Sequence, residues 1–397
     1  MTGVGKLWRH SPQGCHEFGM VNKLYEMLRD TESTVVTFSL QTLNVILSEE
    51  GGVKVNKKMV RYFLTRIVNY KAKEFCFLAD FLAIPVMDED LRIQTLNVLD
   101  PFLDQKDGNI VLSTAKLLTK IVKNQPILRK SLINRLVPVF CGFLKSGSYR
   151  DFNPILIDFL SKLDEDYIYP FISNHKYFFL KSKDSEKLSL KKISFIDKLV
   201  TEDNSVEVLN YLFNLLPQSS KLNSCIFATA ARISVKDTSS YIHCISNLEL
   251  ILKADSDKHV CDILDIVKVL DPVSHRSLDE EKVFTFVRTV LSSTSPSSNL
   301  NPKRITSLLY LLNSFCGYVS NSPYYIEDIL LIEDKSSWSP ILYSQLLSCA
   351  VNVFNIYPAS MQITLGHIFQ LILQQKNHDL QERAVIYYNL LYSESES

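Results

Sequence analysis

The feature that most constrains the fold of this chain is the helical period of its apolar residues. In the stretch "LRDTESTVVTFSLQTLNVILSEEGG", apolar residues at i, i+4, i+7 and i+11 share one side of an α-helix. They are Val36, Leu40, Leu43 and Leu47. We expect Ser33 to be the N-cap and Gly51-Gly52 to stop the helix. Backbone ordering costs about 1–2 kcal/mol per residue and a buried aliphatic side chain contributes about 1.5–3 kcal/mol, so the helix needs neighbours.

The same pattern recurs along the chain with short polar turns between the segments. Helices are expected around residues 20–29, 56–70, 73–84, 88–103, 108–124, 127–145, 150–163, 184–200, 203–216, 219–235, 238–252, 256–270, 278–291, 302–319, 338–357, 360–375 and 379–392. Only 11 glycines and 14 prolines interrupt the chain, which favours long helices over a β-rich fold. Paired helices repeated about every 40 residues predict an all-α fold, an alpha-alpha superhelix (a HEAT/armadillo-type solenoid) of paired antiparallel helices.

Charge and cysteine content narrow the class of protein. Lys+Arg and Asp+Glu both number 43, and a balanced charge argues against nucleic acid as the main partner. The eight cysteines are scattered without a C-x-x-C motif, which predicts free buried thiols in a reducing compartment. The sequence contains neither a signal peptide nor a membrane-spanning apolar run, so we expect a soluble cytoplasmic protein.

No pattern in the sequence indicates catalysis. His243-Cys244 and His259-x-Cys261 are the close His/Cys pairs, but adjacent helical residues diverge by about 100° and cannot easily share one zinc ion. A G-x-S-x-G elbow is absent. Paired carboxylates stand at predicted helix starts, where the helix dipole favours anions. We therefore expect a non-enzymatic protein with no catalytic residue, metal or cofactor.

A basic stretch at residues 173–200 is the one candidate contact site. It contains seven lysines and three acids. Lys187 and Lys191 are spaced i, i+4, with Lys183 one turn earlier and Lys192 adjacent. Three interpretations remain open: contact with anionic lipid, contact with a partner subunit, or a plain solvent-exposed face.

Several stretches, in order, resemble the trunk of the β-adaptins, large subunits of the adaptor-protein vesicle coats. They are "MVNKLYEMLRD", "VILSEEGGVKVNKK", "DGNIVLSTAKLLTKI", "HKYFFLKSKDSEKLSLKKISFIDKLVTEDNSVEVLNYL", "YLLNSFCGYVSNSPYYIEDIL" and "LQERAVIYYNLL". In the fourth stretch the family has a Phe-rich, strand-like piece before a lysine-bearing helix. The acidic-Gly-Gly-Val-x-Val-Asn-Lys run is most like the β subunit of the fourth adaptor complex, whose second large chain is epsilon. The chain has fewer helices before Met20 than a family trunk, so we expect a divergent, N-terminally shortened relative.

The resemblance implies an organisation and a role. We expect residues 1–18 to be an unassigned segment, 19–392 an adaptin-like trunk, and 393–397 a disordered tail. Residues 173–186 and 292–302 are the expected breaks, each interpreted as an inter-repeat loop. The implied partners are medium, small and epsilon-like large subunits in a heterotetramer that sorts cargo into vesicles at trans-Golgi or endosomal membranes. The alternative is another α-solenoid scaffold, such as a nuclear transport receptor.

Overall fold

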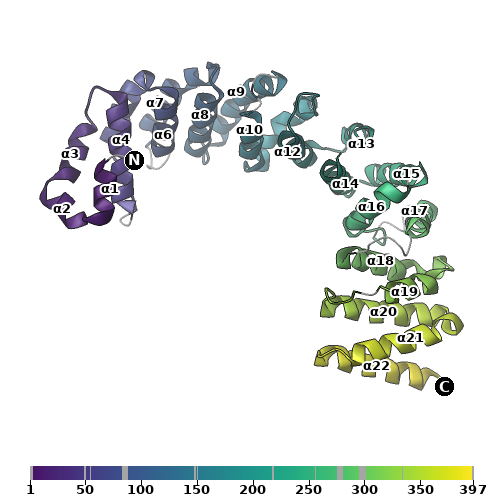
Figure 1. The fold of residues 1–397 in the computed structure, drawn as a ribbon. Helices are drawn as coiled ribbons and strands as arrows, with labels where there is room; N and C mark the ends of the chain where they lie inside the picture. The colour runs from purple at the N-terminus through teal and green to yellow at the C-terminus, as the bar shows by residue number, and fades with distance from the viewer. Residues whose placement is uncertain are drawn as a thin grey trace. The chain divides into compact units, whose positions relative to one another are not determined.

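A computed structural model describes residues 3–48, 51–53, 55–82, 88–146, 149, 151–216, 219–254, 256–274, 280–294, 301–332 and 334–395. These residues form helices and turns, and no strand occurs among them. The helices shown in Figure 1 belong to two compact units, Met1–Lys192 (unit 1) and Ile193–Ser397 (unit 2). The expected all-α solenoid is confirmed as a fold class, and each unit is described below by itself.

Unit 1 contains α1 (Gly3–His10), α2 (Pro12–Glu17), α3 (Met20–Met27), α4 (Ser33–Ile46), α5 (Lys57–Arg66), η2 (Ile67–Asn69), α6 (Ala72–Leu82), α7 (Glu89–Leu99), η3 (Asp100–Asp104), α8 (Gly108–Ile121), α9 (Pro126–Lys145), α10 (Asn153–Ser161), α11 (Glu165–Ile168) and η4 (Tyr169–Phe178). The unit boundary falls within α12 (Glu186–Ile196).

Unit 2 continues with η5 (Asp197–Leu199), α13 (Ser205–Asn214), α14 (Ser220–Ser234), α15 (Thr238–Ala254), α16 (Ser256–Leu270), α17 (Glu280–Ser293), α18 (Pro302–Phe315), η6 (Cys316–Tyr318), α19 (Ser322–Leu330), α20 (Pro340–Ile356), α21 (Pro358–Leu373) and α22 (His378–Ser395).

Helix α4 shows how the apolar stripe positions an element. Val36, Leu40 and Leu43 are at most 1% exposed, as the period predicts. The expected cap is wrong: Glu32 occupies the N-cap position, and the Ser33 hydroxyl instead donates to Glu74 Oε2 at 2.7 Å. A hydroxyl between two repeats therefore joins α4 to α6. The helix ends at Ile46, a turn before the glycines, which adopt the expected left-handed backbone with φ of 86° and 84°.

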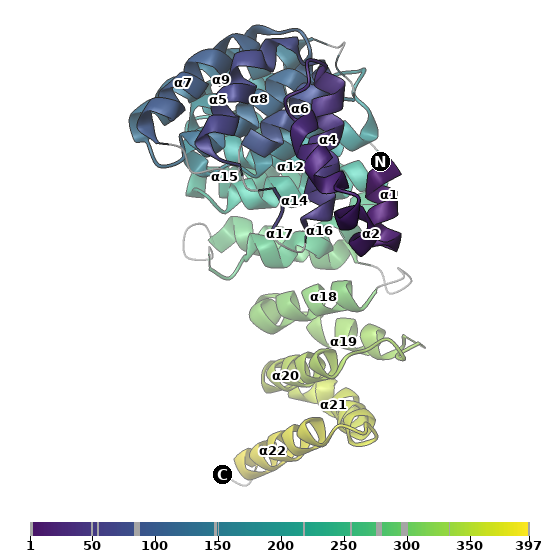
Figure 2. The same ribbon diagram turned by 90° about the vertical axis from the view of Figure 1, so that its left-hand side faces the viewer.

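In each unit the helices form two layers. In unit 1, α6 packs between α4 and α8, whereas α5 packs on α7 in the second layer. In unit 2, α14, α16, α18, α20 and α22 pack in succession, and α13, α15 and α17 form the neighbouring row. Figures 1 and 2 show the last members of unit 2, α18 to α22, stacked one after the other.

Polar contacts between successive repeats of unit 2 recur at a nearly constant sequence separation. The pairs are Ser224–Asp262, Asp271–Tyr310, Asn313–Asn352, Ser344–Arg383 and Ser348–Tyr387, separated by 38, 39, 39, 39 and 39 residues. The expected repeat of about 40 residues is thus visible in the hydrogen bonds as well as in the helices.

Three expectations about local structure require correction. The Phe-rich piece is not strand-like, because Tyr169–Phe178 (η4) forms 3₁₀ turns with a kink at Asn174 and packs on α9. Residues 3–17, expected to be an unassigned segment, form α1 and α2, and α1 packs on α4. At the other end α22 extends to Ser395, into the expected tail. Within the expected break at 292–302, residues 295–300 lie outside the described residues.

The state of the cysteines agrees with the prediction of free thiols. All eight cysteines are free thiols; five are buried and three are half-buried. Among the helices described, none combines the length and apolar character needed to cross a bilayer.

Candidate contact surface

The four lysines predicted to form a contact surface occupy different environments. Lys183 and Lys187 are exposed, and their ammonium groups have no ion pair or hydrogen bond within the described residues. The Lys191 side chain is 24% exposed, and the Lys192 side chain is only 1% exposed. The expectation that Lys192 contacts a membrane or partner is therefore wrong.

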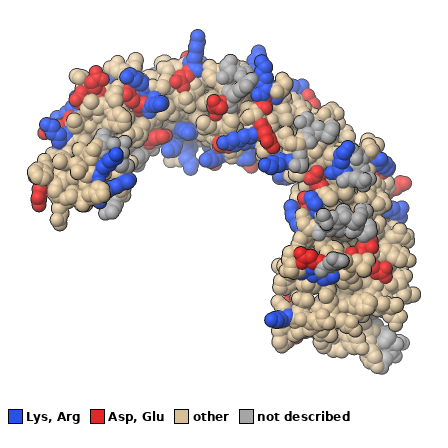
Figure 3. Space-filling view, in the orientation of Figure 1, with Lys and Arg blue, Asp and Glu red and all other residues tan. Residues whose placement is uncertain are grey.

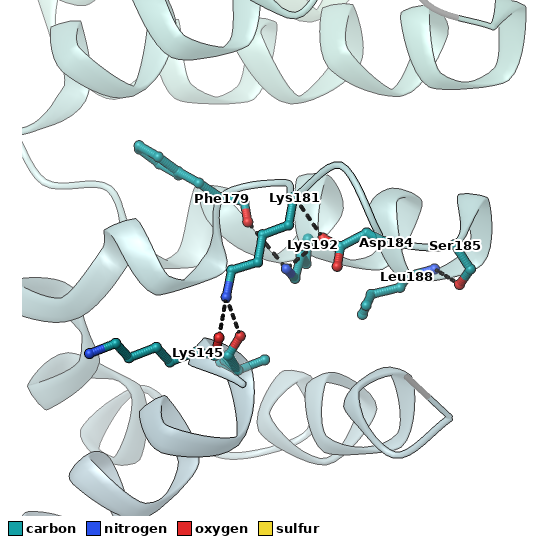
Figure 4. A network of polar contacts seen from close by, with 8 residues as sticks. Lys145, Phe179, Lys181, Asp184, Ser185, Leu188 and Lys192 are labelled. Atoms are coloured by element: carbon teal, nitrogen blue, oxygen red, sulfur yellow. Dashed lines mark hydrogen bonds and ion pairs between the residues drawn. The ribbon is translucent and has the colours of Figure 1, made fainter. Parts of the chain in front are cut away.

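Lys192 is buried because of its position in the helical period. Leu188, Lys192 and Phe195 stand at i, i+4 and i+7 of α12, and each is at most 2% exposed. The Lys192 ammonium lies 2.7 Å from Asp184 Oδ2 and donates to the Phe179 carbonyl at 3.2 Å (Figure 4). Desolvation lowers the pKa of Lys192, and the Asp184 carboxylate opposes this shift. The apolar neighbours of Lys192 in the sequence were the signal that could have revealed its burial.

Lys181 also contributes to the fold, by satisfying the end of a preceding helix. Its ammonium donates to the carbonyls of Leu144 at 2.7 Å and Lys145 at 2.9 Å (Figure 4). These carbonyls belong to the last turn of α9. Carbonyls in a last turn receive no hydrogen bond from within the helix and lie at the negative end of the helix dipole. The backbone N–H of Lys181 donates to the same Asp184 carboxylate at 3.0 Å. One aspartate therefore holds both the loop before α12 and the buried lysine.

Lys191, the residue before Lys192, contacts a different element of unit 1, helix α10. Its ammonium pairs with the Asp158 carboxylate of α10 and donates to the Pro154 carbonyl at 3.2 Å. The candidate surface is thus reduced to Lys183 and Lys187, which alone among the four lack a described partner.

A cleft of about 490 Å³ lies beside Lys183. Its lining includes Leu144, Asn153, Lys181, Lys183, Asp184 and Leu188. Asn153 is 5% exposed, and its Oδ1 atom has no hydrogen-bond partner. The two lysines and one aspartate of this lining favour an anion over a cation, because the aspartate is already neutralised by Lys192.

The two histidines of the pairs considered for zinc have other contacts, and His259 packs against the Phe227 ring. His243 Nε2 lies 2.8 Å from Asn210 Oδ1, and burial raises the pKa of the Cys244 thiol to about 12. A thiol with so high a pKa does not readily supply the thiolate that zinc requires. Across the described residues, no group of three or more His, Cys, Asp or Glu side chains is placed to hold a metal ion.

A second surface, which sequence reasoning missed, lies at the end of unit 2. Residues 336–375 contain no Asp, Glu, Lys or Arg, yet they span α20 and α21. Figure 3 shows this end of unit 2 as almost uncharged. Large apolar side chains that are more than 45% exposed on α20, α21 and α22 are Ile341, Ile363, Leu373, Val385, Ile386, Tyr388, Leu390 and Tyr392. The absence of charged residues from 336–375 can be seen in the sequence. Helical periodicity alone, however, does not show which apolar residues stay exposed.

The chain matches known proteins along its whole length. The model of the adaptin N-terminal region matches residues 3–395, so residues 3–18 belong to the matched region. Mouse AP-4 complex subunit beta-1 is 24% identical over 94% of this chain and 49% of its own length. Beta-adaptin-like protein A of Arabidopsis thaliana is 22% identical over 98% of this chain and 47% of its own length.

Structural similarity agrees with the sequence matches. A chain of a homology model of the full-length AP-3 complex, in an intermediate open conformation, superposes with a TM-score of 0.57 at 14% identity, covering 94% of this chain and 69% of that chain. This likeness supports the solenoid fold. The chain spans about half the length of the relatives that it matches. The match over residues 3–395 shows that the chain belongs to the adaptin N-terminal family.

Proposed function

We propose that this chain is the trunk of a non-enzymatic β-type large subunit of an adaptor-protein vesicle coat. In this role it would scaffold a medium chain, a small chain and a second, epsilon-like large chain in a heterotetramer. The complex would sort cargo into vesicles as a peripheral coat on trans-Golgi or endosomal membranes. Family membership and the similarity to AP-4 and AP-1 β subunits support this assignment. They do not favour a nuclear transport receptor.

The exposed apolar side chains of α20 to α22, with the charge-free stretch 336–375, are the observation that carries the scaffolding role. The cores of stable protein interfaces are depleted of charged residues and enriched in aromatic and large apolar ones. Exposed Ile363, Val385 and Tyr388 have this composition, and residues 336–375 add no charge that would need desolvation. A solvent-facing repeat would instead carry lysine and glutamate, as the exposed positions of unit 1 do.

A smaller part of the proposal concerns the membrane. Lys183 and Lys187 remain available for contact with anionic lipid, because neither side chain is engaged within the described chain. Lys191 and Lys192 are left out of this proposal, because each forms an ion pair within unit 1.

The test is co-expression of the tagged chain with medium, small and epsilon-like subunits, followed by affinity capture. We expect the wild-type chain to capture them. The triple variant Ile363→Glu, Val385→Glu, Tyr388→Glu should lower capture at least tenfold, because three charges would enter an apolar interface. A matched control replaces Val68, Ile93 and Tyr169 of unit 1, which are 76%, 46% and 73% exposed, with Glu.

Two outcomes would contradict the proposal. Failure of the wild-type chain to capture any adaptor subunit would reject the coat role. Equal capture by the two triple variants would retain the coat role and reject the end of unit 2 as the scaffold surface.

A further inference from the structure

Helix α8 of unit 1 carries a row of lysines that no part of the coat assignment uses. Lys116, Lys120 and Lys123 stand at i, i+4 and i+7, on α8 and the turn after it. Lys120 and Lys123 are exposed, and Lys116 is half-buried. None of the three ammonium groups has an ion pair or hydrogen bond within the described residues. They differ in this respect from Lys181, Lys191 and Lys192, whose ammonium groups form hydrogen bonds or ion pairs within the chain.

The fold holds this row in place from behind. Val111, Ala115 and Leu118 on the opposite side of α8 are at most 1% exposed, and the helix packs against α6 and α9. Figure 3 shows Lys and Arg side chains gathered along the edge of unit 1 that runs from α8 to α12. The backbone that carries Lys116 and Lys120 is therefore supported by buried contacts, and Lys123 follows in the turn after the helix.

Two carboxylates lie near the Lys116 end of the row. Asp80 of α6, Asp107 at the start of α8 and Lys116 all act electrostatically on the Cys76 thiol. Asp107 is also occupied as the N-cap of α8, where its Oδ1 accepts the Asn109 N–H at 2.9 Å. At the other end, the Tyr167 hydroxyl donates to the Thr119 carbonyl at 3.4 Å, and Asp164 and Asp166 act electrostatically on Tyr167. Within the described residues none of these carboxylates forms an ion pair with a lysine of the row.

The spacing of the row selects the shape of an anionic ligand. Helical residues three or four apart have Cβ atoms about 5–6 Å apart. In an extended chain, alternate side chains lie on one face and repeat about every 6.6 Å. An extended segment with acidic residues at every second position therefore offers carboxylates in near register with the three ammonium groups.

We propose that the lysine row of α8 is a docking site for an extended acidic segment of a partner protein. The row lacks what a membrane contact by a helix normally has. Interfacial helices place Trp, Phe or Leu beside their lysines, whereas no large apolar side chain of Gly108–Ile121 is exposed. The proposal goes beyond the coat assignment and does not depend on assembly with other subunits.

The test is fluorescence anisotropy of the full chain with a labelled (Glu-Ser)6 peptide. The salt concentration is about 50 mM, at which the Debye length exceeds about 10 Å and charge attraction is only partly screened. We expect Lys116→Glu, Lys120→Glu, Lys123→Glu to weaken binding at least tenfold. The control triple Lys23→Glu, Lys58→Glu, Lys130→Glu changes the net charge equally on α3, α5 and α9, where these lysines are also exposed. It should bind within twofold of the wild type. The milder Lys→Gln triple at the α8 positions should weaken binding several-fold if the Glu triple does not fold.

Further probes make the outcome decisive. A peptide of the same composition with paired charges, (Glu-Glu-Ser-Ser)3, should bind more weakly than (Glu-Ser)6; equal affinity would overturn the register argument. Equal losses in the α8 and control triples would overturn the site itself. Binding of phosphatidylserine vesicles that depends on the α8 lysines, with peptide binding unaffected, would overturn the protein partner in favour of a lipid surface.

Discussion

Helices α8 and α20 both pack within a layer of their unit and present different surfaces. Helix α8 packs beside α6, and α20 packs between α18 and α22. Each buries a continuous apolar face, with Ala115 and Leu346 both at 0% exposure. The free side of α8 and the turn after it carry three lysines, whereas α20 has no charged residue at all.

The difference shows that core and surface carry separate information in this fold. The buried stripe of each helix determines that it stacks, and the same stripe would serve in any solenoid. The exposed stripe determines what the helix binds, because charge or its absence selects between an anionic and an apolar partner.

The largest expected effect separates lysines that support the fold from lysines on its surface. Lys192→Ala should destabilise unit 1 by about 3–5 kcal/mol, because it leaves the Asp184 carboxylate, only 10% exposed, without a counter-charge. Hydrogen exchange of α12 amides measures the loss locally. Lys187→Ala, at an exposed position of the same helix, should change stability by less than about 0.5 kcal/mol.

The double variant Lys192→Met, Asp184→Asn provides the control for charge. It should recover much of the stability, because both buried charges are removed and the volumes are nearly kept. If Lys192→Ala and Lys187→Ala prove equally mild, Lys192 is not held as described, and it would return to the candidate contact surface.

These residues also show how far the sequence could lead. Periodicity predicted most helices and the repeat length, because burying an apolar stripe dominates the free energy of each element. The capping rule failed at Ser33, whose side chain contacts another repeat, and the resemblance failed at Tyr169–Phe178, where 3₁₀ geometry decides the local structure. Of the four candidate lysines, Lys183 and Lys187 are exposed as the contact hypothesis requires, whereas Asp158 and Asp184 engage Lys191 and Lys192. Contacts between repeats depend on tertiary placement, which a single sequence does not specify.

A smaller effect is expected for the exposed lysines of unit 1 in membrane binding. Lys183→Glu, Lys187→Glu should weaken binding of the assembled complex to phosphatidylserine vesicles by roughly 2 kcal/mol, about 30-fold, since each lysine near an anionic surface contributes about 1 kcal/mol. Co-sedimentation with vesicles measures this. Lys23→Glu, Lys58→Glu is the charge-matched control, and a loss of the same size in this control would leave nothing specific to the two lysines of the proposed surface.

The smallest effect concerns how repeats are joined in the two units. In unit 1, Glu74 accepts hydrogen bonds from Ser33 and Thr34 at 2.7 Å each and from the Lys71 N–H at 3.1 Å. Desolvation acts to raise the pKa of Glu74, but these bonds together hold it below its ordinary value of 4.5. A lowered folded-state pKa contributes stability above pH 4.5 that is lost as the pH falls through that pKa. The junction of α18 with α20 uses the amide of Asn352 on the Asn313 carbonyl at 2.7 Å, which does not titrate.

Acidification through the lowered pKa of Glu74 should therefore loosen α4 against α6 by about 1 kcal/mol and leave the junction of α18 with α20 unaffected. Glu74→Gln should reproduce the loosening at pH 7, because an amide cannot accept all three bonds with the strength of a carboxylate. Hydrogen exchange at fixed pH, comparing wild type with Glu74→Gln, avoids the pH dependence of the exchange chemistry. Equal protection of α4 in the two proteins at pH 7, or equal acid sensitivity of the two junctions, would show that the charged and uncharged repeats are joined in the same way.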